Sequence, residues 1–481
     1  MGMKLERFLR WRWLAVAVVV VVAGVAAFGG QPLELWHMAR LQTEFTARDA
    51  DEIATLDDYL ALEERVFAEL DDEVYRKVPT GDAFVLNRYS SGSAADPRTR
   101  DPDFNRTFLL DADNPRGGIL LLHGLTDSPY SLRTLGARLN AMGFRVLGLR
   151  LPGHGTVPAA LRFSRWQDWA AAAELAYDHL ATGLGDKPIH IAGYSTGAAL
   201  ALDLAIGALD EEGKAPASLI LVSPAIGVSR AAALAGPTAA LGRIPGFGRL
   251  VWADVIPEFD PYKYNSFPVN AGAQVHKLTR YTASRISKLV SPGRGDEMPP
   301  IIVFKSAVDA TVSTDALVDR LLGRLPDNGN ELVLFDINRS AIASPILVAD
   351  PGPFTNRLIG DGSLPFGLRL IANADPLGTA VIERYKPPFS AEVTETRQLG
   401  LSWPRGIISL SHVALPFPPD DPLYGQYRPD DPGELYLGQI DIRGERGLLK
   451  LSSDWLLRLR YNPFYPILEE RIIDWVTVDK K

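Results

Sequence analysis

Two kinds of pattern alternate along the chain after Pro79: short continuous runs of Ile, Leu and Val, and stretches with helical spacing of apolar residues. Because parallel strands buried on both faces read as continuous apolar runs, this order predicts an α/β fold with a mostly parallel sheet and helices on both faces. The predicted strands are 104–110, 118–122, 145–151, 188–194, 218–222, 301–305 and 331–337, and the predicted helices are 130–142, 166–182, 196–209 and 314–325.

Two long segments rich in Gly and Pro, 228–298 and 340–405, interrupt this alternation. Without them and the residues before Gly117, about 230 residues remain, which is the size of one compact α/β domain. We therefore expect a single enlarged domain over 104–481 that carries both segments as insertions. A polar loop at its start separates it from an N-terminal helical, acidic segment and linker, 31–103.

The first thirty residues have the pattern of a membrane-targeting segment. Four basic residues, among them Arg10 and Arg12, precede the 18 uncharged residues 13–30. A run of this length is at the lower limit for a helix that crosses the hydrocarbon core, and the basic residues favour a cytoplasmic N-terminus. We interpret residues 1–30 as an uncleaved signal anchor; the alternatives are a signal peptide cut near Ala27 and a buried core helix.

The net charge of −8 is concentrated in residues 51–78, which alone balance to −7. Apolar residues in this stretch recur at spacings of three, four and seven, interrupted only by Glu63, which predicts one apolar face of a helix. This face either binds a partner as a coiled coil or packs on the following domain. The rest of the chain is nearly neutral and has no basic excess, which argues against nucleic-acid binding.

Cysteine is absent from all 481 residues. This excludes disulfides, thiolate nucleophiles, iron–sulfur clusters and thiolate zinc sites. No histidine–carboxylate cluster has the spacing of a metal site either, so we expect neither a metal nor another cofactor. Chemistry must come from hydroxyls, carboxylates and seven histidines.

A glycine-flanked serine follows the predicted strand 188–194. The sequence Gly193-Tyr-Ser195-Thr-Gly197 is the G-x-S-x-G pattern in the context it requires, between a strand and a helix. The nucleophile's backbone must turn sharply there, and flanking glycines remove Cβ atoms that would collide with neighbouring strands. Ser195 is therefore the candidate nucleophile, and the alternative is an ordinary glycine-rich turn.

A serine nucleophile needs a histidine base and a carboxylate that orients it, and in this architecture they follow in the order serine, acid, histidine. His412 is the histidine that lies after a suitable acid. Asp309, at the carboxyl end of a predicted strand, is the preferred acid, and Asp336 is its rival. The alternative for His412 is a loop residue without a role.

An attacked carbonyl also needs backbone N–H donors for its oxygen. The expected donors are Thr196, directly after the nucleophile, and Leu125, in the loop after the predicted strand 118–122. His123 in that loop is interpreted as a residue that shapes the turn. His154 and His190 are interpreted as structural.

The stretches that carry these residues resemble the α/β-hydrolase superfamily, and within it bacterial carboxylesterases and monoacylglycerol-lipase-like serine hydrolases. The stretches that carry this resemblance are Ile119-Leu-Leu-Leu-His-Gly-Leu-Thr-Asp-Ser-Pro-Tyr130, Arg150-Leu-Pro-Gly-His-Gly155, Gly193-Tyr-Ser-Thr-Gly197 and Ser306-Ala-Val-Asp309. The resemblance implies a Ser195–His412–Asp309 triad, an oxyanion hole at Leu125 and Thr196, and a lid at about 228–298 that lines an apolar acyl pocket. The sequence departs from relatives in the segment 340–405, which precedes the histidine and would form a second pocket wall or a membrane contact.

We expect a serine hydrolase that cleaves carboxylic esters, lipid or monoacylglycerol esters among them. Its location would be the bacterial inner membrane, with a single span and an extracytoplasmic catalytic domain, or it would be exported after signal cleavage. The alternatives are an amidase, peptidase or acyltransferase with the same triad, and an idle hydrolase fold that serves as an envelope interaction module. Oligomeric state and acyl-chain length do not follow from the sequence.

Overall fold

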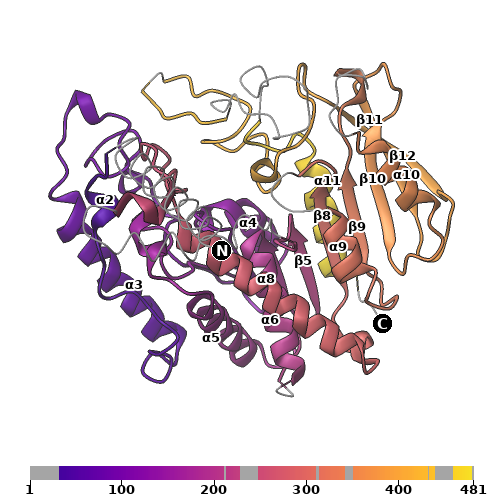
Figure 1. Cartoon of the computed structure of the whole chain (residues 1–481), viewed down its shortest axis with the longest axis horizontal. Helices are drawn as coiled ribbons and strands as arrows, with labels where there is room; N and C mark the ends of the chain where they lie inside the picture. Colours follow the sequence, from indigo (N-terminus) through magenta and orange to yellow (C-terminus); the bar gives the residue numbers. More distant parts are fainter. Residues whose placement is uncertain are drawn as a thin grey trace, which may run out of the picture.

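Ten strands form one sheet in the residues that the computed structural model describes, which are 32–210, 213–227, 248–309, 314–341, 350–431, 433–438 and 459–478 (Figure 1). The strand order is β1-β3-β2-β4-β5-β8-β9-β10-β11-β12. Neighbours from β3 through β10 pair in parallel, whereas β1–β3, β10–β11 and β11–β12 are antiparallel. The mostly parallel sheet is therefore confirmed. Its strands are β1 Phe108–Leu110, β2 Gly118–Leu122, β3 Arg145–Leu149, β4 Ile189–Tyr194, β5 Ser218–Val222, β8 Ile301–Ser306, β9 Glu331–Phe335, β10 Gly367–Asn373, β11 Ala380–Lys386 and β12 Glu395–Ser402.

Helices cover both faces of this sheet, as the alternation along β2 illustrates. Leu120 and Leu122 belong to one apolar core together with residues of α5, α6 and α8. Ile119 and Leu121 belong to a second core that includes residues of α4 and α11. The helices are α2 Leu35–Met38, α3 Leu56–Leu70, α4 Arg133–Ala141, α5 Trp166–Leu184, α6 Thr196–Asp210, α8 Val269–Val290, α9 Thr314–Leu317, α10 Gly352–Gly360 and α11 Tyr465–Thr477.

Every predicted strand and helix of the body is present, with ends shifted by a few residues. The predicted helix 314–325 is α9 followed by a π-helical turn, Val318–Leu322. These elements were predictable because their side chains enter one of the two cores, which imposes a continuous apolar run or a helical period on the sequence.

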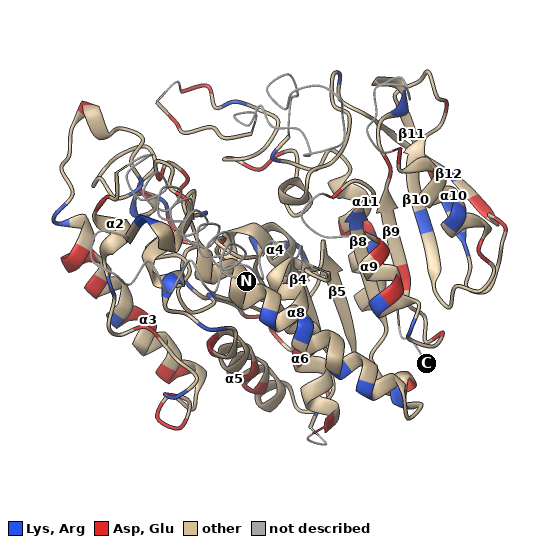
Figure 2. Cartoon of the chain, viewed as in Figure 1, with Lys and Arg blue, Asp and Glu red and all other residues tan. Residues whose placement is uncertain are grey.

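The acidic N-terminal segment packs on the body through α3, the long helix at the left of Figure 1. A reciprocal capping box between Thr55 and Asp58 starts this helix. Its buried face includes Tyr59 and Val66, while Asp57 and other acidic residues remain on the outside (Figure 2). The apolar face thus contacts the chain's own body, so it is not available for a coiled-coil partner.

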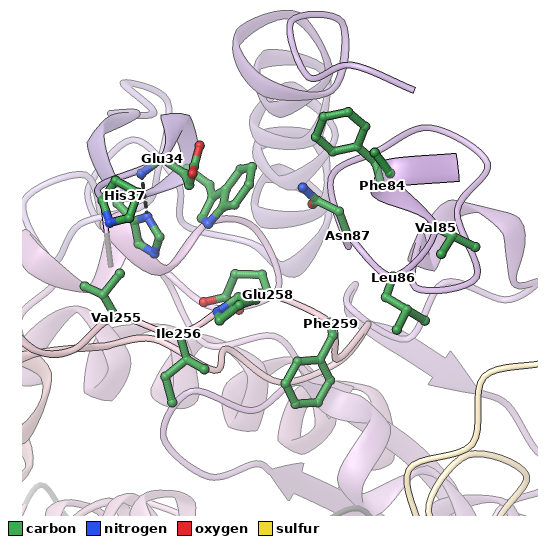
Figure 3. Close-up of a pocket in the computed structure, with 14 residues that line it drawn as sticks. Glu34, His37, Phe84, Val85, Leu86, Asn87, Val255, Ile256, Glu258 and Phe259 are labelled. Carbon is green, nitrogen blue, oxygen red and sulfur yellow. Dashed lines mark hydrogen bonds between the residues drawn. The ribbon is translucent and has the colours of Figure 1, made fainter. Parts of the chain in front are cut away.

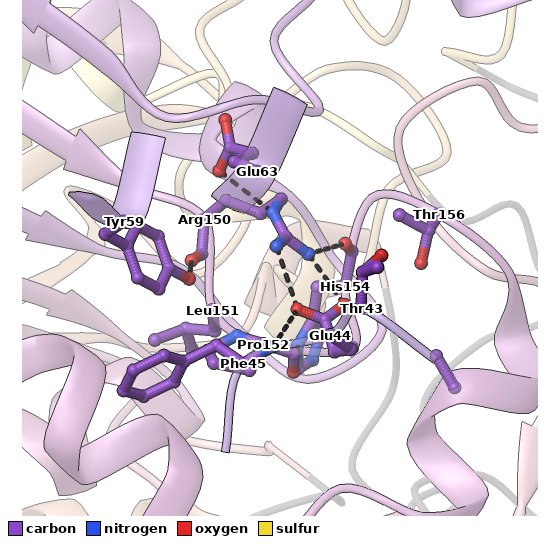
Figure 4. A network of polar contacts seen from close by, with 12 residues as sticks. Thr43, Glu44, Phe45, Tyr59, Glu63, Arg150, Leu151, Pro152, His154 and Thr156 are labelled. Atoms are coloured by element: carbon purple, nitrogen blue, oxygen red, sulfur yellow. Dashed lines mark hydrogen bonds and ion pairs between the residues drawn. The ribbon is translucent and has the colours of Figure 1, made fainter. Parts of the chain in front are cut away.

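Glu63, which interrupts the predicted apolar face, is buried because it pairs with Arg150 (Figure 4). The Arg150 guanidinium donates to Glu63 Oε2 at 2.9 Å and to both carboxylate oxygens of Glu44, at 2.9 and 3.0 Å. It also donates to the carbonyl of His154 at 3.0 Å, and the Tyr59 hydroxyl donates to the carbonyl of Arg150 at 2.7 Å. This cluster fastens the N-terminal segment to the loop that follows β3.

The segment 340–405 extends the sheet. Residues 342–349 lie outside the described part, and α10 and strands β10 to β12 follow. β10 adds to β9 in parallel, with Leu368 opposite Leu332, and β11 and β12 complete the edge. These strands use their backbone groups in the ladder of the central sheet, and the second pocket wall or membrane contact expected of this segment stays a prediction.

The predicted lid range, 228–298, combines two different parts. Residues 228–247 lie outside the described part, and a short antiparallel pair, β6 Trp252–Asp254 with β7 Phe267–Pro268, follows. The remainder contains α8, whose Leu278 and Ile286 are buried in the same core as α5 and α6. Arg285 of α8 also pairs with Asp203 of α6 at 2.7 Å. Residues 269–290 are thus a helix of the body, not of a lid.

Among the helices of the described ranges, none combines the length and apolarity needed to cross a membrane. The predicted anchor, residues 1–30, falls outside those ranges.

Replacing Arg150 with Met should lower the free energy of unfolding by about 3–5 kcal/mol, because the buried Glu63 and the partly buried Glu44 would lose their cation. Urea denaturation followed by tryptophan fluorescence measures this loss. The matched control is Arg76→Met: Arg76 pairs with Asp71 and Asp72 at the surface and is 69% exposed, so its loss should cost less than about 1 kcal/mol. Equal stabilities of the two variants would contradict the structural role of the cluster.

Candidate active site

Ser195 occupies a tight turn between the end of β4 and the start of α6. Its φ angle of +54° lies in the left-handed region, which residues with a side chain rarely adopt. The neighbouring strand holds the turn in place: Ser195 N–H donates to the carbonyl of Val222 at 2.9 Å, and the Ser195 carbonyl accepts from Ala225 N–H at 3.0 Å. Such strain persists where surrounding structure fixes it, and it gathers at functional sites.

The two flanking glycines make this turn possible. A Cβ atom on Gly193 would lie 2.5 Å from the Cα of Ala198, and one on Gly197 would collide with the carbonyl of Leu122 on β2. Real Cβ atoms do not approach backbone atoms so closely. The structure thus supplies the steric reason that the sequence pattern implied for both positions.

The two proposed oxyanion donors belong to elements that meet beside Ser195. Thr196 is the first residue of α6, so its N–H belongs to the helix turn that lacks intrahelical acceptors. The loop after β2 lies against the serine, since a Cβ on Gly124 would be 3.3 Å from the Cβ of Ser195. Leu125 follows Gly124 directly. The placement is compatible with an oxyanion hole, which remains a prediction.

His412 and Asp309 are brought together across a separation of more than a hundred residues. His412 Nδ1 donates to Asp309 Oδ2 at 2.9 Å, and both side chains are buried. Tyr194, adjacent to the serine, places its ring centroid 5.4 Å from that of His412, and its hydroxyl reaches the His412 carbonyl at 3.4 Å. The base–acid pair therefore lies beside the turn that carries Ser195.

Asp336, the rival for the acid position, has another partner. Its Oδ2 lies 3.2 Å from Arg339 Nε, and no contact with His412 is present in the described structure. Burial raises the pKa of Asp336, and the nearby Arg339 opposes that rise. The geometry thus favours Asp309 over Asp336.

The histidines interpreted as structural make backbone or hydroxyl contacts. His123 Nδ1 donates to the carbonyl of Gly124 at 2.9 Å, and its Nε2 accepts from Leu151 N–H at 3.0 Å. Burial keeps its pKa well below the ordinary value, so its ring stays neutral. His190 Nδ1 lies 2.7 Å from the Ser218 hydroxyl on the neighbouring strand. His123 thus ties the loop after β2 to the one after β3.

Comparison with known proteins assigns a family to this arrangement. Residues 113–285 match the family model described as serine aminopeptidase, S33. A thermostable monoacylglycerol lipase of Bacillus sp. (strain H-257) is 30% identical over 182 residues, which are 38% of this chain and 69% of that lipase. The chain belongs to the α/β-hydrolase superfamily, in its monoacylglycerol-lipase-like branch.

This hydrolase is also similar to solved structures. One, described for the metagenome-derived lipolytic enzymes LipS and LipT, is 20% identical, covers 48% of this chain and 87% of that chain, and has a TM-score of 0.38. The monoacylglycerol lipase of Paleococcus ferrophilus is 20% identical and covers 48% of this chain and 88% of that chain, with a TM-score of 0.35.

Sequence reasoning missed Lys305 of this hydrolase, although it lies four residues before the acid. Its ammonium donates to Asp309 Oδ2 at 2.7 Å, and both side chains are fully buried. Burial alone would raise the pKa of Asp309, but the charges of His412 and Lys305 outweigh it and hold that pKa well below its ordinary value. The sequence signal that could have identified Lys305 is its position within an otherwise apolar strand.

A buried polar cluster, also missed, ties together the loops around the catalytic pair. Asp260 accepts from the Tyr424 hydroxyl at 2.5 Å and from Arg460 Nη2 at 2.8 Å. Tyr264, from the same stretch as Asp260, donates its N–H to the carbonyl of Thr126 at 2.8 Å. These contacts join the segment before α8, the loop after β2 and the chain that follows His412.

A pocket of about 450 Å³ opens where the described chain of the hydrolase begins (Figure 3). The stretches that line it come from 32–37, 83–87 and 255–259. Val85 and Leu86 are exposed on its rim, and Glu258 is buried in its wall, where burial raises its pKa to about 7. None of the lining residues belongs to the candidate triad.

No group of three or more His, Asp or Glu side chains in the described ranges is arranged to hold a metal ion.

Replacing Asp309 with Asn should lower kcat for p-nitrophenyl ester hydrolysis by about 10³–10⁴-fold, because the amide cannot orient His412 or stabilise its charged form. KM should change little. Asp336→Asn is the matched control, since this buried carboxylate directly follows the next strand, β9, and pairs with Arg339; it should keep most of the activity. A larger loss in the Asp336 variant would make Asp336 the catalytic acid.

Proposed function

We propose that this hydrolase is a serine esterase that cleaves carboxylic esters through an acyl-serine intermediate. The observation that carries the proposal is the buried Asp309–His412 pair beside the strained turn of Ser195. A neutral imidazole oriented by a carboxylate takes the proton of the serine hydroxyl as that hydroxyl attacks the ester carbonyl.

The reaction proceeds in two halves that use the same groups. Ser195 Oγ forms a bond to the carbonyl carbon, and the N–H groups of Leu125 and Thr196 receive the negative charge on its oxygen. His412 then gives its proton to the leaving alcohol. A water molecule, deprotonated by His412, then attacks the acyl carbon; the bond from this carbon to Ser195 Oγ breaks, the acid is released, and His412 returns the proton to Ser195. Asp309 stabilises the imidazolium in both halves.

For the substrate we favour lipid esters with a single acyl chain, such as monoacylglycerols. The support is the monoacylglycerol lipase that is 30% identical to this chain. The matching family model bears the name of a serine aminopeptidase, which favours amide hydrolysis as the second candidate. Both reactions need the same nucleophile and base, so product analysis must decide between them.

We further propose that residues 13–30 anchor the hydrolase in a bacterial inner membrane and that the stretch 228–268 acts as its lid. The uncharged run and the basic residues before it support the anchor. The apolar pocket beside Pro32, with Val85 and Leu86 exposed, supports a body that contacts the lipid surface near this anchor. Helix α8 is left out of the lid because it belongs to the body.

The intact protein should hydrolyse p-nitrophenyl esters and monoacylglycerols, and Ser195→Ala should abolish both activities together with labelling by a fluorophosphonate probe. Ser284→Ala, at an exposed serine of α8, is the control and should keep both activities.

A series of esters of increasing acyl length tests the lid. A variant that lacks residues 228–247 should lose the preference for long acyl chains. Release of amine from peptide substrates without ester cleavage would favour the amidase. Unchanged hydrolysis by the Ser195 variant would refute the mechanism.

Deletion of residues 1–30 should move the protein from the membrane fraction to the soluble fraction of a bacterial host while leaving the triad intact. N-terminal sequencing of the full-length product distinguishes the anchor from a cleaved signal, because only the anchored form keeps the first residues. A full-length protein that is soluble and uncleaved would contradict the proposed location.

A further inference from the structure

Lys305 and His412 approach the same oxygen atom of Asp309. The lysine ammonium lies 2.7 Å from Oδ2, and His412 Nδ1 lies 2.9 Å from it. The side chain of Lys305 has no exposed surface, and neither has that of Asp309. A fully buried cation thus lies within hydrogen-bond distance of the carboxylate that orients the candidate base.

The position of Lys305 follows from the pattern of β8. Ile301 and Val303 point to the same face of this strand and enter the apolar core beneath α6 and α8. Lys305 is the next residue on that face, so its ammonium must leave water when the chain folds. Such a charge is costly unless an opposite charge receives it, and Asp309 is that partner.

We propose that Lys305 is a positioning residue of the triad, which holds the buried Asp309 carboxylate ionised and in register with His412 and whose positive charge opposes protonation of the imidazole. The proposal rests on the esterase mechanism above. Lys305 acts through Asp309 and touches neither the serine nor the substrate.

The direction of the effect follows from the charges around the imidazole. A positive ammonium near His412 disfavours the charged imidazolium, whereas the Asp309 carboxylate favours it. After β9, the Asp336–Arg339 pair is internally compensated, and Tyr194 at the end of β4 contributes an uncharged ring. Removal of the lysine charge therefore raises the pH below which the base is protonated and inactive.

The experiment compares the pH dependence of kcat/KM for a p-nitrophenyl ester between the native hydrolase and Lys305→Met. The acid limb should move to higher pH by about one unit or more, because the Lys305 ammonium and the His412 ring contact the same oxygen of Asp309 in a buried site, where charges are weakly screened. The kcat at the alkaline plateau should fall while KM stays, because the substrate site is untouched.

Lys386→Met is the matched control. Lys386 is also a buried lysine of the central sheet, 1% exposed on β11, but three strands away from the strand of Lys305. Its variant should leave the acid limb where it is. Lys305→Gln is the second variant, used if the methionine variant does not fold, because its amide can still donate to Asp309 but carries no charge. It should shift the acid limb of the pH profile in the same direction.

An NMR titration of the His412 ring, assigned with a His412→Gln variant, measures the same effect without any substrate. It distinguishes failure of the inference from failure of the proposed esterase activity. A raised His412 pKa in the Lys305 variant supports the inference even for a protein that cleaves no ester. A folded Lys305 variant whose His412 titration and acid limb match those of the native protein would overturn it.

Discussion

A left-handed backbone conformation at Ser195 is the constraint around which the catalytic half of this hydrolase is arranged. The turn needs a strand before it, a helix after it and neighbours that leave no room for a Cβ at Gly193 or Gly197. The hydrogen bonds that hold it come from Val222 at the end of β5, the next strand of the sheet, and from Ala225 in the loop that follows. The parallel sheet is therefore more than a scaffold, since the register of three strands decides whether the serine can be presented at all.

The acid and the base reach this turn by different routes. Asp309 follows β8 directly, so sheet pairing places it, whereas His412 is held by long-range contacts of its loop. Ser411 donates to the carbonyl of Leu459 at 3.2 Å, and Tyr194 reaches the His412 carbonyl. The buried cluster around Asp260 fixes the surrounding loops. A precise catalytic geometry thus depends on polar contacts between segments that are distant in the sequence.

The sequence was sufficient to predict the elements whose side chains enter a core. It was insufficient for elements and side chains whose position depends on pairing with distant parts of the chain. Strands β2 and β5 are continuous apolar runs in the sequence, and the flanking Gly193 and Gly197 identify Ser195 as the candidate nucleophile. Helix α8 was hidden inside a Gly- and Pro-rich segment, and β10 to β12 are not continuous apolar runs, because charged residues such as Arg369, Glu383 and Arg397 interrupt them. His412 could be found by elimination, but Lys305 needed the structure, because only folding shows which acid receives its charge.

The added strands of the segment 340–405 have one further consequence, which concerns association between molecules. Without them β9, whose residues are all buried, would be the open edge of the sheet next to the strand that precedes Asp309. With them the edge is β12, where exposed Glu395 and Arg397 alternate with other residues and the pairing with β11 is interrupted by a register shift. Charged side chains and irregular pairing discourage a foreign strand from docking. The extension therefore protects this edge of the sheet against edge-to-edge aggregation at a distance from the catalytic strands.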